Sequence, residues 1–333
     1  MYSKKSDLKI IMMNYALYII MIIMIGAIAM ISPRFLSLRV LTDILTQSST
    51  RILVALGCMF IIVSGSADLS GGRVVGLTAV VAGSLAQTSE YYIKFWPGLP
   101  EMPIFIPVLA AVLVGVLVGA FNGIAVAKLK VPAFLATLGT QMVVYGINCL
   151  YFNKAPNNSQ PLGGYLKSFS RIGTGNIAGI PYLVIIALGC AVAVWILQTK
   201  TCLGKEIFAV GGNPIAAKVS GINVFKILMI TYMLAGALYG LAGCLEATRT
   251  GSASSSYGLS YELDAIASCI VGGCSAGGGV GTVGGVVFGV LIFNIINYGL
   301  TFIGLSSYWQ FIVKGLIIII AVAIDVRKYA GKD

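Results

Sequence analysis

The chain contains no histidine, and only 11 of its 333 residues are aspartate or glutamate. Histidine is the commonest general base and metal ligand near neutral pH, so its absence excludes a histidine-ligated metal site and argues against an enzyme. The sequence also lacks the G-x-x-x-x-G-K-[ST] pattern with which a phosphate-binding loop holds a nucleotide. If the protein uses ATP, hydrolysis must take place on a partner, and no cofactor is expected on this chain.

Charged residues form only 10% of the chain, compared with about 25% in a typical soluble domain. Hydrophobic residues form 58%, the mean hydropathy is +0.95, and apolar runs recur along the whole length. This composition excludes a soluble protein, so the net charge of +11 informs on membrane loops and not on a nucleic-acid surface. We expect an all-α polytopic membrane protein of about ten helices, several of them broken by glycine, forming one domain over residues 1–333.

Polar breaks between the apolar runs predict the positions of these helices. The expected helices cover residues 15–32, 52–66, 74–89, 104–127, 132–151, 180–197, 224–245, 262–275, 279–298 and 307–325. With a cytoplasmic N-terminus, 13 of the 22 basic residues, Arg73 among them, lie inside, and eight, Arg51 among them, lie outside. The positive-inside rule therefore predicts that both termini are cytoplasmic.

The carboxylates fall at or near the ends of the expected helices, and none lies deep within one. A transporter driven by an ion gradient usually needs an acidic side chain inside the membrane to carry a proton or a cation. This distribution argues against such a transporter. Sodium held by backbone carbonyls would escape the argument, so an ion-coupled secondary transporter stays open as the alternative.

The longest expected cytoplasmic loop, over residues 198–223, contains a predicted short helix. Asn213 is a good N-cap, Pro214 suits the first helical position, and Gly221 can take the left-handed conformation that ends a helix. Ala216 and Ala217 favour helix between them. About two turns of helix are marginal in water, so we expect this helix to pack against the protein's own loops or against a groove on a cytoplasmic ATPase.

Two glycine-rich turns are expected at the cytoplasmic face, the first between the second and third helices and the second between the eighth and ninth. They contain Asp68, Gly71 and Gly72, and Gly272, Gly273 and Gly278. Such runs fit either close backbone packing or non-helical segments that form part of a gate. Asp68 could pair with Arg73, contact the cytoplasmic loop, or remain solvated.

Several polar residues interrupt the apolar helices or lie at their ends, where burial in lipid would be costly. They are Tyr145, Asn148, Asn294, Asn297, Tyr298 and Lys314. Each could line a pathway, and each could equally serve helix packing or an interfacial position. For Lys314 we consider an amine that reaches the outer interface, an ion pair, or contact with cargo. The Gly- and Ser-rich segment 248–261 could receive a partner protein or be an exposed connector.

The predicted cytoplasmic helix, together with Ser-Gly-Ser-Ala-Asp-Leu-Ser-Gly-Gly at 64–72 and Tyr-Glu-Leu-Asp-Ala-Ile-Ala at 261–267, resembles the permease subunits of bacterial ABC sugar importers. The resemblance spans nearly the whole chain and is to the ribose, xylose and galactose branch. Further segments are most similar to the galactose and methyl-galactoside group, namely 45–49, 137–140, 144–148 and 297–304.

This resemblance implies a permease that moves a monosaccharide, galactose or a methyl-galactoside, into the cytoplasm across a bacterial inner membrane. It implies a homodimer, a cytoplasmic ABC ATPase with two cassettes that binds ATP and magnesium, and a periplasmic or extracellular sugar-binding protein. It also implies that the helix from Asn213 to Gly221 couples the permease to the ATPase. An ion-coupled secondary sugar transporter is the alternative function.

Overall fold

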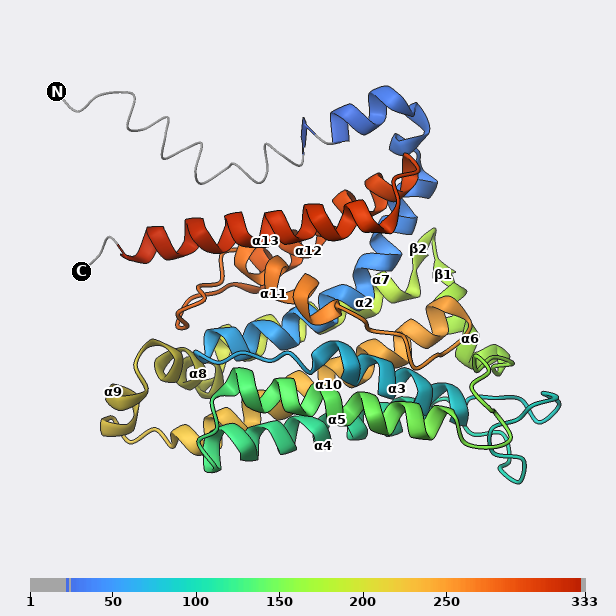
Figure 1. Ribbon diagram of the computed structural model, residues 1–333, viewed down its shortest axis with the longest axis horizontal. Coiled ribbons are helices and arrows are strands. Elements are labelled where there is room, and N and C mark those ends of the chain that lie inside the picture. Colours follow the sequence, from blue (N-terminus) through green and yellow to red (C-terminus); the bar gives the residue numbers. More distant parts are fainter. Residues whose placement is uncertain (1–21, 24, 331–333) are drawn as a thin grey trace.

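The computed structural model describes residues 22–23 and 25–330, which form a bundle of helices lying side by side (Figure 1). The long helices are α2 (Leu38–Val63), α4 (Phe105–Gly123), α5 (Ala133–Phe152), α7 (Tyr182–Lys200), α10 (Val224–Thr250), α12 (Val283–Phe302) and α13 (Ser307–Ala330). The shorter ones are η1 (Pro33–Leu36), α3 (Gly71–Leu85), η2 (Ile124–Lys128), α6 (Lys167–Thr174), α8 (Cys202–Gly212), α9 (Pro214–Val219) and α11 (Tyr261–Val271). A hairpin of two strands with two residues each, β1 (Asn176–Ile177) and β2 (Ile180–Pro181), precedes α7.

Six of the described helices, α2, α4 with η2, α5, α7, α10 and α12, are long and apolar enough to cross a membrane. Each expected helix from 52–66 onward coincides with an observed one. Of the expected helix 15–32, residues 22–23 and 25–31 are helical, and residues 15–21 and 24 lie outside the described residues. The expected start of the second helix at residue 52 is wrong, because α2 begins at Leu38, where Ser37 accepts a hydrogen bond from the backbone N of Val40. Helices α6 and α8 were not expected.

Helices α3 and α11 each span only half of the bundle. With 15 and 11 residues, they are about 22 and 16 Å long at 1.5 Å per residue, shorter than the roughly 30 Å of a bilayer core. In Figure 1, α3 occupies the half nearer α6, α11 occupies the half nearer α8, and the two helices begin near the middle. Segments 64–70 and 251–260 lead from the ends of α2 and α10 back into the bundle. Residues 64–70 therefore form a re-entrant segment and not a short turn, while the assignment of this segment to the cytoplasmic side stays a prediction.

Helix α10 forms the centre of the bundle and packs on α2, α3 and α4. Its contact with α4 is made by glycines, since a Cβ added at Gly115 would lie 2.1 Å from the carbonyl oxygen of Gly236. Such close backbone approach is typical of helix packing in membranes. Helix α2 is largely buried, whereas α4, α5 and α7 each expose most of their apolar side chains, as expected for helices whose solvent is lipid.

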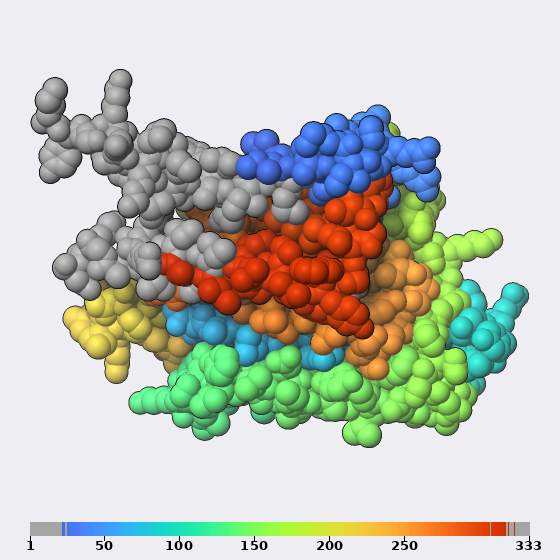
Figure 2. Space-filling view, turned by 45° about the horizontal axis from the view of Figure 1, so that its top comes forward, coloured from blue at the N-terminus to red at the C-terminus, as the bar shows by residue number. Residues whose placement is uncertain are grey.

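The two ends of the bundle differ. Helices α8 and α9 and the end of α13 lie at one end, here named the coupling end, whereas segment 86–103, α6 and the hairpin lie at the other, the loop end (Figure 1). On one face of the molecule, α13 in red and α5 in green are separated by a band with the colours of α2–α3 and of residues 251–282 (Figure 2). The half-helices therefore lie between α5 and α13.

Candidate functional site

Helix α9 at the coupling end has the predicted local structure. The side-chain oxygen of Asn213 accepts hydrogen bonds from the backbone N of Ile215, at 3.0 Å, and of Ala216, at 2.9 Å. Pro214 occupies the first turn, and Gly221 has a φ of 84°. The N-cap and the left-handed terminator are therefore confirmed as elements of local structure.

The surface of α9 is apolar where it faces away from the bundle. Ala217 is only 4% exposed, whereas Ile215 and Val219 are 77% and 85% exposed, and Ala216 is exposed beside them. Residues four apart lie on one face of a helix, so Ile215 and Val219 form an apolar pair at the coupling end. Short helices with an exposed apolar face commonly insert into a groove of a partner.

The predicted glycine turns are closely packed. A Cβ at Gly71 would lie 2.9 Å from the Tyr239 ring, and one at Gly72 would lie 2.0 Å from a carboxylate oxygen of Glu262. One at Gly272 would lie 2.4 Å from the carbonyl oxygen of Gly285, and one at Gly278 would lie 2.6 Å from that of Gly211. Gly273 has open space around it and a φ of 90°, so it serves the turn itself. Four of these five glycines are therefore closely packed.

Asp68 is buried, with 3% of its surface exposed, and the expectation of a solvated turn is wrong. Its carboxylate accepts hydrogen bonds from the backbone N of Ser70, at 2.7 Å, and from the Ser70 hydroxyl, at 2.6 Å. Arg73 stacks over the ring of Tyr145, at 4.2 Å from the guanidinium carbon to the ring centroid. Asp68 is buried because segment 64–70 re-enters the bundle, and Arg73 follows in the first turn of α3.

Polar groups gather where α3 and α11 begin, in a region here named the half-helix junction. Asn148 of α5 is fully buried, and its amide donates a 3.4 Å hydrogen bond to the carbonyl oxygen of Ser255. The amide oxygen of Asn148 and one carboxylate oxygen of Glu262 have no hydrogen-bond partner among the described residues. An unpaired buried polar atom costs about 1–3 kcal/mol. Both oxygens therefore have unused capacity to accept a hydrogen bond.

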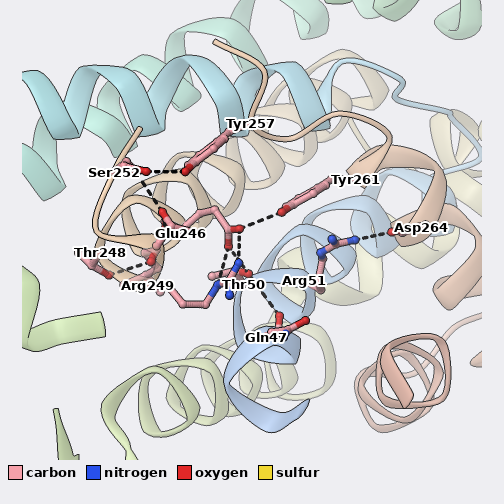
Figure 3. Close-up of polar contacts among 12 residues, drawn as sticks. Gln47, Thr50, Arg51, Glu246, Thr248, Arg249, Ser252, Tyr257, Tyr261 and Asp264 are labelled. Carbon is pink, nitrogen blue, oxygen red and sulfur yellow. Dashed lines mark hydrogen bonds and ion pairs between the residues drawn. The ribbon is translucent and has the colours of Figure 1, made fainter. Parts of the chain in front are cut away.

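A second set of charged groups surrounds Tyr261 and Asp264 at the start of α11 (Figure 3). Arg51 of α2 is paired with Asp264 of α11, which also binds the Lys314 amine of α13 at 2.9 Å. The Arg51 guanidinium carbon lies 3.7 Å from the centroid of the Tyr261 ring. Tyr261 donates a 2.9 Å hydrogen bond to Glu246 of α10.

The Glu246 carboxylate extends this network toward the loop end. It binds Arg249 at 2.6 Å and accepts a 2.8 Å hydrogen bond from the Thr50 hydroxyl of α2 (Figure 3). One connected set of polar contacts thus links α2, α10, α11 and α13. Such a network holds the half-helix α11 against three neighbours.

Two carboxylates contradict the expectation that all acids lie near span ends. Glu262 and Asp264 are 7% and 6% exposed, because α11 begins inside the bundle. Glu246, near the end of α10, is also buried, with 3% of its surface exposed. Arg51, expected outside the membrane, lies near the middle of α2. Glu246 and Asp264 are held by cations, which reduces their capacity to carry a proton or sodium ion, whereas Glu262 makes no ion pair among the described residues.

The structure places the predicted pathway residues in two groups. Tyr145 and Asn148 lie beside Arg73 and segment 251–260, and Lys314 lies beside Arg51 and Asp264. Asn294 and Asn297 line a cavity of about 10 Å³ with Arg51, Tyr261 and Asp264, which is room for about one water molecule. Tyr298 instead donates a 3.3 Å hydrogen bond to Asp43. For Lys314, the ion pair is the arrangement observed.

Sequence reasoning missed Arg51, Arg73, Glu246, Glu262 and Asp264 as members of the junction. A signal was available for two of them, since Glu262 and Asp264 lie in the first turn of a short apolar helix, where the helix dipole stabilises acids. Segment 248–261 is not a simple exposed connector. Ala253 exchanges backbone hydrogen bonds of 2.8 and 2.9 Å with Leu162, and Gly258 packs against Gly72.

Comparison with known proteins gives full-length matches. Residues 40–322 match the family model described as the permease component of the branched-chain amino acid transport system. The galactose/methyl galactoside import permease of Salmonella typhimurium is 49% identical over 320 residues, covering 95% of both chains. That of Haemophilus influenzae is 46% identical over 321 residues, also covering 95% of both.

A more distant relative is the ribose import permease of Escherichia coli K12, which is 37% identical over 313 residues, covering 93% of this chain and 92% of the relative. No solved structure matches the chain.

Proposed function

This chain belongs to the family of the branched-chain amino acid transport system permease component, and we propose that it is the permease subunit of an ABC importer for galactose or a methyl galactoside. The observation that carries the proposal is the full-length similarity to galactose/methyl galactoside import permeases. The apolar helices and the absence of a phosphate-binding loop agree with a transport subunit whose ATP is hydrolysed elsewhere.

Coupling to the ATPase is assigned to α9. Asn213 and Pro214 start this helix, Gly221 ends the segment, and Ala217 anchors it to the bundle, which leaves Ile215 and Val219 exposed. In this proposal the apolar pair enters a groove of a cytoplasmic ABC ATPase with two cassettes, which binds ATP and magnesium. The ATPase can then move α9 without any nucleotide on this chain.

The sugar pathway is assigned to the half-helix junction. Discontinuous helices that begin inside a bundle are a recurring device for binding cargo at mid-membrane. Asn148 and Glu262 offer unpaired oxygens there, which suit the hydroxyls of a neutral sugar, and Tyr145, whose ring is stacked by Arg73, lies beside them. The junction is closed in this conformation, so cargo would enter only when the half-helices separate.

Orientation and assembly complete the proposal. Lys200, Lys205, Lys218 and Lys226 belong to or adjoin helices α7 to α10 at the coupling end, so the positive-inside rule assigns that end to the cytoplasm. The proposal keeps both termini cytoplasmic, as the distribution of basic residues in the sequence predicts. The loop end would then receive a periplasmic or extracellular sugar-binding protein. A second copy of the chain would complete the pathway in a bacterial inner membrane.

The alternative function, an ion-coupled secondary sugar transporter, is favoured by one observation only. Glu262 is a buried acid with an unpaired oxygen, the kind of group that can carry a proton or sodium ion. The full-length similarity to import permeases outweighs it.

Reconstitution with omission of single components tests the proposed function. Proteoliposomes would contain this chain, its ATPase, the binding protein and internal ATP, and uptake of labelled galactose would be measured with each component left out in turn. The proposal predicts uptake only when all are present, with competition by methyl galactoside and weak competition by ribose. Full uptake without the binding protein or the ATPase would contradict it.

A further inference from the structure

Three segments that are far apart in sequence meet at the coupling end, in close contacts between their backbones. They are the end of α2 at Val63 and Gly65, the last turn of α8 at Gly211, and the turn between α11 and α12 at Gly278 and Gly279. We name these five residues the glycine cluster. It joins both predicted glycine turns to the loop that carries α9.

A hydrogen bond lies at the centre of the glycine cluster. The backbone N of Gly279 donates to the carbonyl oxygen of Val63 at 2.8 Å. A Cβ added at Gly211 would lie 1.7 Å from that same oxygen and 2.9 Å from the donor nitrogen. Any side chain at position 211 would therefore enter the hydrogen bond that ties α2 to the second glycine turn.

The neighbouring contacts are equally close. A Cβ at Gly278, where φ is 84°, would lie 2.6 Å from the carbonyl oxygen of Gly211 and 2.8 Å from the Cα of Gly65. Gln198, at the end of α7, is buried and donates a 3.0 Å hydrogen bond to the carbonyl oxygen of Gly281 in the same turn. The cluster is thus held from α7 as well as from α8.

Position 211 is also adjacent to the coupling helix. Gly211 lies two residues before Asn213, which ends α8 and caps α9. Backbones packed at these distances cannot slide past one another independently, because interiors transmit displacement when no free space remains. A movement of α9 is therefore passed to the end of α2 and to the turn that follows α11.

We propose that Gly211 is the positioning residue through which the coupling loop moves both half-helix turns together. This inference rests on the proposed function, since it assumes that a partner moves α9. It adds a mechanical link: segment 64–70 leads into α3, residues 272–282 follow α11, and the cluster joins both to α8. Both half-helices would be displaced by one event at α9.

The test uses two neighbouring glycines with different surroundings. Gly211→Ala places a methyl group in the cluster, whereas Gly212→Ala meets nothing within 4 Å and is the matched control. In proteoliposomes with the ATPase and the binding protein, we expect Gly211→Ala to lower galactose transported per ATP hydrolysed by about tenfold or more, with Gly212→Ala unchanged. An unchanged transport-to-hydrolysis ratio in Gly211→Ala would overturn the inference.

These outcomes distinguish failure of the inference about Gly211 from failure of the proposed function. If the unmodified chain fails to transport in an ATP-dependent way, the proposed function is wrong and the inference falls with it. If the unmodified chain transports and Gly211→Ala transports with the same ratio, the proposed function stands and the positioning role of Gly211 is wrong.

A second measurement does not depend on the folding of Gly211→Ala. Spin labels at Gly212→Cys and Gly277→Cys would report the distance across the cluster, in a chain whose exposed Cys202 and partly exposed Cys149 and Cys190 are replaced by serine. We expect that distance to stay constant between the nucleotide-free and ATP-trapped complexes, while a pair at Gly212→Cys and Leu109→Cys, on α4 outside the cluster and the half-helices, changes. Separation of positions 212 and 277 on trapping would overturn the inference.

Discussion

Loss of the Asp264 carboxylate would leave two cations side by side in the interior. Arg51 and Lys314 both pair with Asp264, and the three side chains are 25%, 18% and 9% exposed. Removing one partner of a buried ion pair costs about 3–5 kcal/mol, because the remaining charge is left desolvated. Arg51 and Lys314 keep partial exposure, so we expect Asp264→Asn to lower the free energy of unfolding by about 3 kcal/mol.

Lys314→Met is the informative comparison. It leaves the Arg51–Asp264 pair intact and removes one cation, so we expect a loss of about 1 kcal/mol or less. In Asp264→Asn combined with Lys314→Met, only one cation remains without a carboxylate. The double variant should therefore be more stable than the sum of the two single effects by about 1–2 kcal/mol.

The assay is unfolding of the purified protein in mixed detergent micelles by increasing SDS, followed by loss of helical circular dichroism. Tyr298→Phe, which removes a 3.3 Å hydrogen bond to Asp43 away from this network, serves as the control. Additive effects of Asp264→Asn and Lys314→Met, within about 0.5 kcal/mol, would refute the reasoning that Asp264 neutralises both cations.

Three further predictions concern the coupling end and the junction. Ile215→Asp puts a charge on the exposed apolar face of α9, so binding of the ATPase in detergent should weaken by about tenfold or more, equivalent to at least about 1.4 kcal/mol. Lys218→Gln, at another exposed position of α9, should have no effect. If Ile215→Asp binds the ATPase as tightly as the unmodified chain, α9 is not the docking helix. Gly278 has a φ of 84°, and a Cβ there would lie 2.6 Å from the carbonyl oxygen of Gly211. The amount of Gly278→Leu protein in the membrane should therefore fall several-fold compared with Gly277→Ala. Normal abundance of Gly278→Leu would contradict close packing at this turn. Glu262→Gln keeps a hydrogen-bonding side chain, so ATP-driven galactose uptake by this variant should stay within about threefold of normal. If the chain were an ion-coupled transporter, loss of this carboxylate would abolish uptake almost completely.

The positions of the long helices could be predicted because a run of about 20 apolar residues indicates a membrane-spanning helix. Helix α9 could be predicted because its signals are local: Asn213, Pro214 and Gly221 lie within nine positions of one another. Both features depend on neighbouring residues only. Sequence patterns of this kind are read without knowledge of the rest of the fold.

The half-helices and the start of α2 could not be predicted in this way. Re-entry of the chain before α3 and α11 depends on the helices against which these short helices pack. In the sequence, the 15-residue apolar run of α3 looks like a short membrane-spanning helix. Arg51 interrupts the apolar pattern of α2, yet it points into the protein and pairs with Asp264, which is 213 residues away. A partner at that distance in sequence leaves no local signal.

The candidate site was predicted in part for the same reason. Tyr145 and Asn148 were identified because polar residues stand out in an apolar helix, and the structure places both beside α3. Glu262 and Asp264 were assigned to a helix end at the membrane surface, because the sequence does not show that this helix begins inside the bundle. Their role as the centre of the junction follows from tertiary structure alone.

The energy source is the most direct test of the account. Labelled-galactose uptake would be measured in proteoliposomes that contain this chain, its ATPase and the binding protein, with internal ATP present or absent and with proton and sodium gradients clamped or collapsed. The account predicts uptake that requires ATP and is unchanged when both gradients are collapsed. Uptake by this chain alone that follows a proton or sodium gradient would contradict it.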